Sequence, residues 1–306
     1  MRESARAAEV GICAASTTLQ RVEFRRFFIA LIFAVALCSS CLVRTRTVVP
    51  RGQRPDKPLL TANKQELIER IHRVADPIHS FSLKVDMSPS VGGVFGGKVT
   101  DYPTIHGFIL FRRPDQIRVI GLDPVVHSTV VDMVSLGNDF RVSIPAKSQF
   151  IEGANNAPAT SKNKLENLRP IAFLNSLLIS PPGAGEYAIL EDDSDETKSL
   201  YKLIFVLREG EELRLLRIVN FDRYTLDITR QRTFDAAGQV TSETKYADWT
   251  KHGDVRFPGT IDMARPQDGY ALQLNVTEFV LNPADLTDEK FVLEPPANVQ
   301  VRELAK

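Results

Sequence analysis

The sequence predicts a mainly β protein with a few helices, an α+β fold dominated by one antiparallel sheet. Three observations lead to this fold class. Apolar and polar residues alternate with a period of two along most of the chain after residue 80, turn-forming residues separate the alternating segments, and two segments after residue 60 have helical character. Strands joined by short turns pair antiparallel, and a sheet of many strands curls or closes to reduce its exposed edges. We therefore expect one curved antiparallel sheet with helices against it.

The N-terminal segment has the features of an export signal. Arg25 and Arg26 precede an apolar run at 27–37, and small residues follow at Ser39 and Ser40. A basic stretch, a short apolar stretch and a small-residue cleavage site characterise a signal peptide, whereas a membrane-spanning helix needs about 20 apolar residues. We therefore expect residues 1–40 to be removed, and exclude them from the fold.

Cys41 is the predicted site of lipid attachment. Ser39-Ser40-Cys41 resembles a bacterial lipobox, in which a peptidase cuts before a cysteine that carries diacylglycerol, although Cys38 stands where leucine is usual. The alternatives are an ordinary secretory signal, or a short membrane anchor whose cysteines are incidental. The chain has three cysteines, at positions 13, 38 and 41. The body after them therefore has no disulfide, cysteine-bound metal or catalytic cysteine.

Residues 41–60 are predicted to be the lipidated N-terminus and a flexible tether. Arginines and prolines recur there without the period of a helix or a strand. The basic residues would either add attraction to anionic headgroups, about 1 kcal/mol each near a membrane, or belong to a merely soluble linker. Because the net charge of the whole chain is zero, the remaining body is mildly acidic, which argues against a nucleic-acid partner.

Residues 61–306 are expected to form a single domain that opens with a helix. Asn63 can cap the helix, Glu66 stands at the capping-box position, and Pro77 ends the helix. The period then changes to two over Phe81–Met87, which predicts a strand with one buried face.

Further strands are predicted wherever this alternation returns between turn residues. Before residue 160 they are Thr104–Phe111, Gln116–Gly121, Val125–Val134, Phe140–Ile144 and Ser148–Ile151. After residue 200 they are Leu203–Leu207, Leu213–Asn220, Tyr224–Thr229, Gln239–Trp249, Val255–Met263 and Tyr270–Val280. Short connections between consecutive strands favour an antiparallel meander.

A second helix is predicted at Leu165–Ile179, between the two groups of strands. Its apolar residues have helical spacing, Pro170 can occupy its first turn, and a Pro-Pro-Gly sequence at 181–183 stops it. This helix can cover one opening of a curved sheet.

A glycine-flanked loop at Val91–Gly97 has apolar residues, Val94 and Phe95, at its tip. Apolar side chains on an exposed loop favour contact with a membrane or a partner. The alternative, that they fold back onto the sheet, is at least as well supported.

The order of these features resembles the LolA and LolB lipoprotein-sorting family. The shared features are the lipidated Cys41, a basic tether, an amphipathic N-terminal helix, a meander of about eleven strands and a helix inserted midway, over Thr61–Leu293. The resemblance implies an open half-barrel whose apolar concave face is covered by helices and receives acyl chains. It also implies a protruding apolar loop, here Val94-Phe95. Leu42 is similar to the residue that follows the cysteine in outer-membrane lipoproteins, which implies anchoring at the periplasmic face of the outer membrane.

A concave sheet face must be filled by side chains, a helix or a ligand. The candidate lining residues come from alternating strand positions and from the midway helix. They are Phe81, Leu83, Val85, Ile171, Phe173, Leu174, Tyr224, Leu226, Ile228, Leu272 and Leu274. For any single residue ordinary core is the alternative, since alternating apolar residues need only burial. Only the whole set indicates an apolar cavity.

Known catalytic motifs are absent from the sequence. It contains no His-Glu-x-x-His, no Gly-x-Ser-x-Gly, no phosphate loop and no dinucleotide fingerprint. The five histidines form no close ligand pair, and Glu191–Glu196 lacks the glycine and spacing of a calcium loop. We therefore expect no enzyme, no metal and no cofactor.

The expected function is that of a lipid-anchored envelope protein that binds acyl chains or lipidated proteins, as a lipid carrier or in lipoprotein localisation. Its partners would be the membrane, through the N-terminal lipid, and the bound acyl chains or lipoproteins. The alternative is a structural lipoprotein that holds an envelope protein complex together through the outer surface or edges of its sheet. A hydrolase, with polar residues converging in a pocket, is the third possibility.

Overall fold

The computed structural model describes residues 44–46, 58–92, 98–156, 168–195, 198–297 and 299–304 of the chain. The chain divides into two units, Met1–Arg44 and Thr45–Lys306, and nearly all the described residues belong to the second. The expected signal peptide, the lipidation site Cys41 and the Val94-Phe95 loop tip lie outside the described residues.

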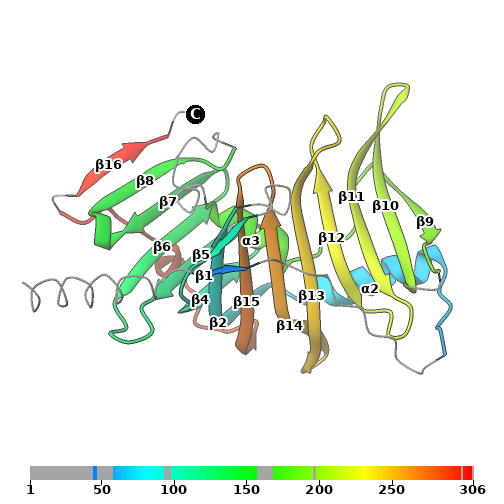
Figure 1. Ribbon diagram of the computed structural model, residues 1–306, viewed down its shortest axis with the longest axis horizontal. Coiled ribbons are helices and arrows are strands. Elements are labelled where there is room, and N and C mark those ends of the chain that lie inside the picture. The colour runs from blue at the N-terminus through cyan, green and yellow to red at the C-terminus, as the bar shows by residue number, and fades with distance from the viewer. Residues whose placement is uncertain are drawn as a thin grey trace, which may run out of the picture. The chain divides into compact units, whose positions relative to one another are not determined.

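Within the described residues, hydrogen bonds join sixteen strands into one sheet (Figure 1). The strands are β1 (Arg44–Arg46), β2 (Ser80–Val91), β3 (Val99–Asp101), β4 (Ile105–Arg112), β5 (Gln116–Leu122), β6 (Thr129–Leu136), β7 (Asp139–Ile144), β8 (Gln149–Ala154), β9 (Glu186–Asp192), β10 (Leu200–Glu209), β11 (Glu212–Asp222), β12 (Ile228–Phe234), β13 (Val240–His252), β14 (Val255–Arg265), β15 (Tyr270–Leu281) and β16 (Gln300–Glu303). The predicted fold class is confirmed, but the predicted count of about eleven strands was too low. Three of the missed strands, β1, β3 and β16, have no more than four residues each, which is too short for a visible alternation.

The sheet consists of two antiparallel meanders joined side by side. β2, β4, β5, β6, β7 and β8 follow one another in chain order, and so do the strands from β9 to β15. The two meanders meet where β2 pairs antiparallel with β15, and β16 adds to β8 in parallel. The chain therefore passes from β8 to β9, near opposite ends of the sheet, by way of the inserted helix α3 (Pro170–Leu177).

Two predicted strands begin later than expected. In each case the residues predicted to start the strand form a turn, which an aspartate side chain stabilises through hydrogen bonds to the backbone. Asp123 accepts hydrogen bonds from the N–H groups of Val125 and Val126, which are 81% and 69% exposed, and β6 begins only at Thr129. Asp222 likewise accepts from the N–H of Tyr224, and β12 begins at Ile228. Aspartate side chains that bond backbone two or three residues ahead favour turns over strands.

The N-terminal helix α2 (Lys64–Ala75) confirms the predicted capping box. The N–H of Glu66 donates to Asn63 Oδ1 over 3.0 Å, and the N–H of Asn63 donates to Glu66 Oε2 over 2.8 Å. The helix buries Leu67, Ile71 and Ala75 against the sheet and contacts β9 and β14.

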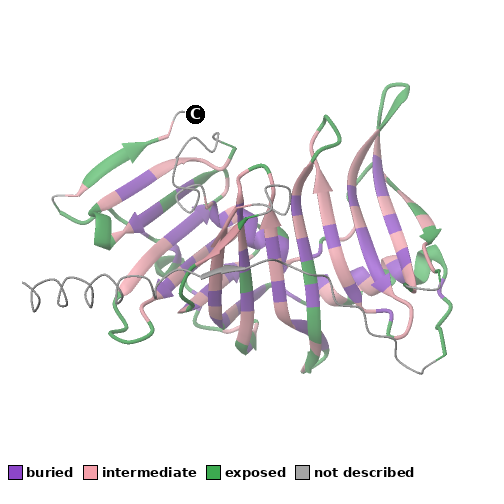
Figure 2. Cartoon of the chain, in the orientation of Figure 1, coloured by how far each residue is buried: buried purple, intermediate pink, exposed green. Residues whose placement is uncertain are grey.

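The midway helix α3 is shorter than the predicted Leu165–Ile179. Pro170 occupies its first turn as predicted. The C-cap of the helix is Leu178, whose N–H donates to the carbonyl of Leu174 and whose backbone is extended. Both helices lie on the same face of the sheet, behind the strands as seen in Figure 1. Their buried side chains join one apolar core with inward residues of the strands (Figure 2).

The sheet curves toward α3. This helix contacts β5 and β6 on one side and β14 on the other. Five steps of the sheet order separate β6 from β14, which is about 24 Å on a flat sheet at roughly 4.8 Å per step. A helix of eight residues is only about 12 Å long. The side-chain contacts of α3 reach further, because Arg169 lies over Phe140 on β7 and the Asn175 carbonyl accepts from Gln231 on β12, eight steps or about 38 Å apart on a flat sheet. The strands therefore bend around the helix, and the face that carries the core is concave.

The opposite face is partly covered by the C-terminal segment, which includes the 3-10 turn η4 (Asp288–Phe291). Arg112, Arg118 and Arg141 donate to the backbone carbonyls of Leu286, Lys290 and Leu293 respectively. A second, small core lies beneath this segment and contains Val134, Phe150, Phe291 and Leu293. The 3-10 turn η2 (Pro145–Lys147) connects β7 to β8.

Candidate functional site

The candidate site is the concave face of the sheet beneath α3. This helix presents apolar side chains to the sheet: Ala172, Phe173 and Leu177 are at most 3% exposed, and Leu174 is 7% exposed. Its N-cap, Arg169, makes no side-chain cap hydrogen bond. With only eight residues, a helix of this kind owes its stability to packing rather than to its own hydrogen bonds. Packing against the apolar face that it covers therefore contributes to holding α3 in place.

A row of buried polar residues also lies on the sheet beneath α3. Thr244 on β13 donates to the hydroxyl of Ser176 over 3.1 Å, and Gln231 on β12 donates to the carbonyl of Asn175 over 3.3 Å. Gln231 and Thr244 stand opposite each other in the register of β12 and β13. Polar groups in a core cost free energy unless they are hydrogen-bonded. Two sheet strands therefore bind α3 through specific polar contacts as well as through apolar packing.

Arg217 on β11 forms hydrogen bonds with the segment that follows α3. Its guanidinium donates to the carbonyl oxygens of Ser180 and Pro181 and pairs with Glu186 at 3.1 Å. It also lies over the ring of Phe205, 4.3 Å from its centroid. The chain leaving α3 is thus tied to the sheet by a nearly buried cation.

Several buried polar atoms of the described residues lack a hydrogen-bond partner. In this region they include Gln231 Oε1, Arg217 Nε and the phenol oxygen of Tyr246. An unsatisfied buried polar atom costs about 1–3 kcal/mol. Such atoms are available to a ligand group, since Nε can donate to a carbonyl or carboxylate oxygen, and Oε1 can accept from a hydroxyl or amide.

The other end of α3 rests on a charged and aromatic cluster. The Arg169 guanidinium lies over the ring of Phe140, 4.5 Å from its centroid, and its pKa is lowered chiefly by burial. Tyr270 on β15 is 2% exposed, and burial raises the pKa of its phenol, an effect that the charge of Arg265 only partly offsets. The phenol therefore stays neutral, as a buried hydroxyl suited to hydrogen bonding rather than to acid–base chemistry.

Most of the predicted lining residues come together in the core of the concave face. Those that join the buried core are Phe81, Leu83, Val85, Phe173, Leu174, Leu226, Ile228, Leu272 and Leu274. Ile171 is partly buried against the same core. Tyr224 is half-buried and lies in the turn between β11 and β12, rather than on a strand.

The polar row beneath α3 was missed in the sequence. The signal was present, because Gln231 and Thr244 occupy inward positions of their strands where apolar residues are usual. Which residues of β12 point inward can be told only once the start of this strand is known. The strand was predicted to start at Tyr224, but the turn held by Asp222 places its start at Ile228.

No helix in the described part of the chain has both the length and the apolar character needed to cross a bilayer. In the same residues, histidine, cysteine and carboxylate side chains form no group of three that could hold a metal ion.

Comparison with known proteins finds similarity among solved structures. No family model and no curated protein matches the sequence. A LolA superfamily protein from Nitrosomonas europaea is 14% identical, with 76% of this chain and 99% of that chain covered and a TM-score of 0.48. A DUF1329 family protein from Desulfovibrio piger is 15% identical, with 74% and 95% covered and a TM-score of 0.48. A domain named for outer membrane lipoprotein sorting, from Vibrio parahaemolyticus, is 13% identical, with 74% and 94% covered and a TM-score of 0.45.

Proposed function

We propose that this chain is a lipid-anchored protein of the cell envelope that holds an acyl chain, free or attached to a protein, between its concave sheet and α3. It would act as a carrier or receiver of lipidated molecules at the periplasmic face of the outer membrane, with Cys41 as its own anchor. No catalytic step is part of this proposal.

The observation that carries the proposal is the way in which α3 fills the concave face. Three large apolar side chains, Phe173, Leu174 and Leu177, occupy it. Burying each is worth about 2–3 kcal/mol, or roughly 6–9 kcal/mol together, whereas a sixteen-carbon chain gains about 12 kcal/mol at 0.8 kcal/mol per methylene. The apolar gain from a long acyl chain therefore exceeds the apolar loss on displacing α3 by about 3–6 kcal/mol. This surplus is available to offset the loss of the hydrogen bonds that Thr244 and Gln231 donate to α3.

The unsatisfied polar atoms support the same function. An acyl chain ends in a carboxylate, ester or amide, and Arg217 Nε offers a donor beside the apolar surface. A ligand with a long apolar body and one oxygen-bearing end fits such a surface better than a purely apolar or purely polar molecule.

A reversible disulfide between α3 and the sheet tests the proposal. Ser176 and Thr244 have their hydroxyls 3.1 Å apart, one on α3 and one on the sheet. In a full chain whose cysteines at 13, 38 and 41 are replaced by serine, the pair Ser176→Cys and Thr244→Cys can be joined by a disulfide. We expect the oxidised protein to lose binding of a fluorescent palmitate analogue, and reduction to restore it.

The matched control is Ser176→Cys alone, for which oxidation should not change binding. Equal binding by the oxidised and reduced double variants would show that α3 does not gate an acyl site. Absence of binding in every state would contradict the acyl-binding function itself.

A second candidate function, a module of an envelope complex, is favoured by the edge strand β9. This strand ends the sheet, and Tyr187 and Ile189 on it are 58% and 50% exposed. Exposed edges with apolar side chains accept a strand from a partner. If this is the function, Ile189→Lys should abolish crosslinking to an envelope partner and leave palmitate binding unchanged.

A further inference from the structure

A second cavity lies between α2 and the adjoining ends of β12, β13 and β14, on the face of the sheet that also carries α3. Its volume is about 250 Å³. The inner wall is apolar and is formed by Val74, Leu226, Ile228 and Trp249. Trp249 is fixed there, because its indole N–H donates to the carbonyl of Ile228 over 2.9 Å. The cavity has space for a ligand the size of a headgroup, and less than the volume of about 300–1,000 Å³ typical of a whole drug-sized molecule.

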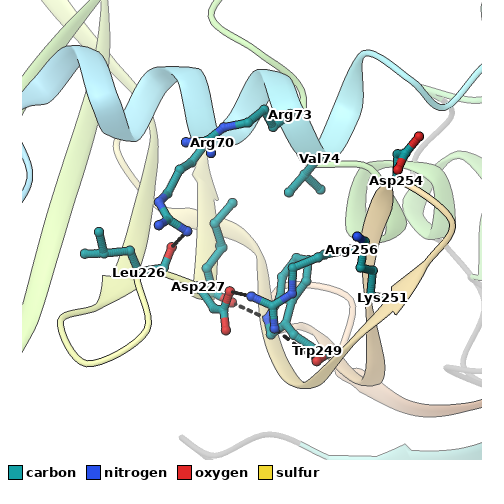
Figure 3. Close-up of a pocket in the computed structure, with 10 residues that line it drawn as sticks. Arg70, Arg73, Val74, Leu226, Asp227, Trp249, Lys251, Asp254 and Arg256 are labelled. Carbon is teal, nitrogen blue, oxygen red and sulfur yellow. Dashed lines mark hydrogen bonds and ion pairs between the residues drawn. The ribbon is translucent and has the colours of Figure 1, made fainter. Parts of the chain in front are cut away.

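Cationic side chains dominate the polar part of this cavity. They are Arg70 and Arg73 from α2, Lys251 from β13 and Arg256 from β14. Figure 3 shows Arg70 projecting from the helix toward Leu226, with Arg256 of β14 beside Asp227, the residue that directly precedes β12. Two carboxylates, Asp227 and Asp254, also line the cavity. Four cations against two anions give the cavity a positive charge.

The internal ion pairs do not satisfy these cations. Asp227 pairs with Arg256, which also donates to the carbonyl of Trp249 over 3.0 Å. Arg70 donates to the carbonyl of Leu226 over 3.3 Å, a weak contact with a neutral acceptor. None of Arg70, Arg73 and Lys251 forms an ion pair with any residue that the structure describes, and Arg73 donates only to the carbonyl of Glu69. Three of the four cations therefore line the cavity without a carboxylate partner among these residues.

Burial makes this arrangement costly for Arg70. The pKa of Arg70 is lowered, first by burial and next by the charge of Arg73, and Arg256 lowers it further. Asp227 and Glu66 offset only part of this effect. An anion placed between the three arginines would remove the repulsion and replace the lost hydration.

We infer that this cavity binds a phosphate group, carried either by a lipid headgroup or by a free phosphate ion. Guanidinium groups bind phosphate oxygens through paired N–H donors, and here they approach from a helix and from a strand. The apolar wall beside them suits the carbon atoms next to a phosphate ester. This site lies beneath α2 and not beneath α3, although Leu226 and Ile228 of its wall belong to the same apolar core. The inference does not depend on the acyl site.

Trp249 provides a direct readout, because it is the only tryptophan in the chain. The full chain would be titrated separately with inorganic phosphate and with dihexanoyl phosphatidic acid below its micelle concentration, while the tryptophan fluorescence is followed. Saturation by both probes, with similar affinity, indicates a phosphate-ion site. Saturation by the lipid alone indicates a headgroup site. If neither probe produces a saturable change, the inference is wrong.

Two variants and a matched control complete the test. We expect Arg70→Gln to weaken binding about tenfold or more, because it removes a charged, partly buried donor. Lys251→Gln changes an exposed position and should weaken phosphate binding about threefold. This variant replaces the Arg70 variant in the test if the latter does not fold. The control is Arg208→Gln, which removes the same charge from an exposed position next to the β10–β11 turn. Equal weakening by the control would show general electrostatic attraction and overturn the site.

Discussion

The hydroxyl of Thr244 on β13 donates to the hydroxyl of Ser176 on α3 over 3.1 Å, and both residues are almost fully buried. This contact joins the short helix that covers the concave face to the sheet beneath it. We expect Thr244→Val to lower the free energy of unfolding by about 1–3 kcal/mol, because it leaves the Ser176 hydroxyl buried without its partner.

The double variant Ser176→Ala with Thr244→Val should recover most of that loss, since both polar groups are then absent. Urea unfolding followed by circular dichroism measures the difference. If the single and double variants are equally destabilised, the contact does not stabilise α3 in the way described.

Acyl-chain length should decide whether a ligand displaces α3. At about 0.8 kcal/mol per methylene, roughly ten methylenes are needed to match the apolar side chains of the helix. We therefore expect palmitate to bind and octanoate not to bind in isothermal titration calorimetry. Phe173→Ala should lower the required length, because less apolar surface then has to be replaced. Comparable binding of octanoate and palmitate would contradict the displacement mechanism.

Arg118 should be important for the stability of the outer face. Its guanidinium forms a bidentate ion pair with the carboxylate of Asp132, with N–O distances of 3.0 and 2.7 Å, and also donates to the carbonyl of Lys290. Both partners of the pair are largely buried, with side chains 18% and 13% exposed. We expect Arg118→Ala to cost about 2–4 kcal/mol, because Asp132 would remain without its cation. Hydrogen exchange should show faster exchange in the C-terminal segment around η4.

The matched control for this prediction is Arg141→Ala. Arg141 also donates to a carbonyl of the C-terminal segment, that of Leu293, but its side chain is 48% exposed. Its loss should cost below about 1 kcal/mol. Similar destabilisation by both variants would mean that the Asp132 pair is not the main source of the effect.

Asp235 should make stability depend on pH in the acidic range. Its carboxylate accepts from the N–H of Gln239 and from the side chain of Gln267, and these bonds hold the pKa of Asp235 below its usual value. A carboxyl with a lowered folded-state pKa stabilises the fold above the unfolded value of about 3.9, and that contribution is lost as the pH falls toward the folded value. Asp235→Ala should therefore lower Tm at pH 7, and the difference from the unchanged chain should shrink below about pH 4. A constant difference across this range would exclude the carboxylate as its cause.

Local patterns were sufficient for the elements whose residues decide their own backbone. Asn63 and Glu66 cap α2 as predicted, Pro170 begins α3, and the alternation over Phe81–Met87 lies within β2. Each of these signals acts within a few residues, so neighbouring sequence is enough to read it. The errors arose where one side chain overrode the alternation, as Asp123 and Asp222 do by holding turns ahead of β6 and β12.

Residue patterns were enough to predict the β class, the inserted helix and most of the residues that share the apolar core. The folded chain was needed to show that β2 pairs with β15, that Gln231 and Thr244 lie beneath α3, and that Arg70 and Arg256 line one cavity. Periodicity reports which side of a strand or helix is buried, whereas pairing across the sheet sets which distant side chains meet. Both proposed binding sites depend on such distant meetings, and neither can be read from a local run of residues.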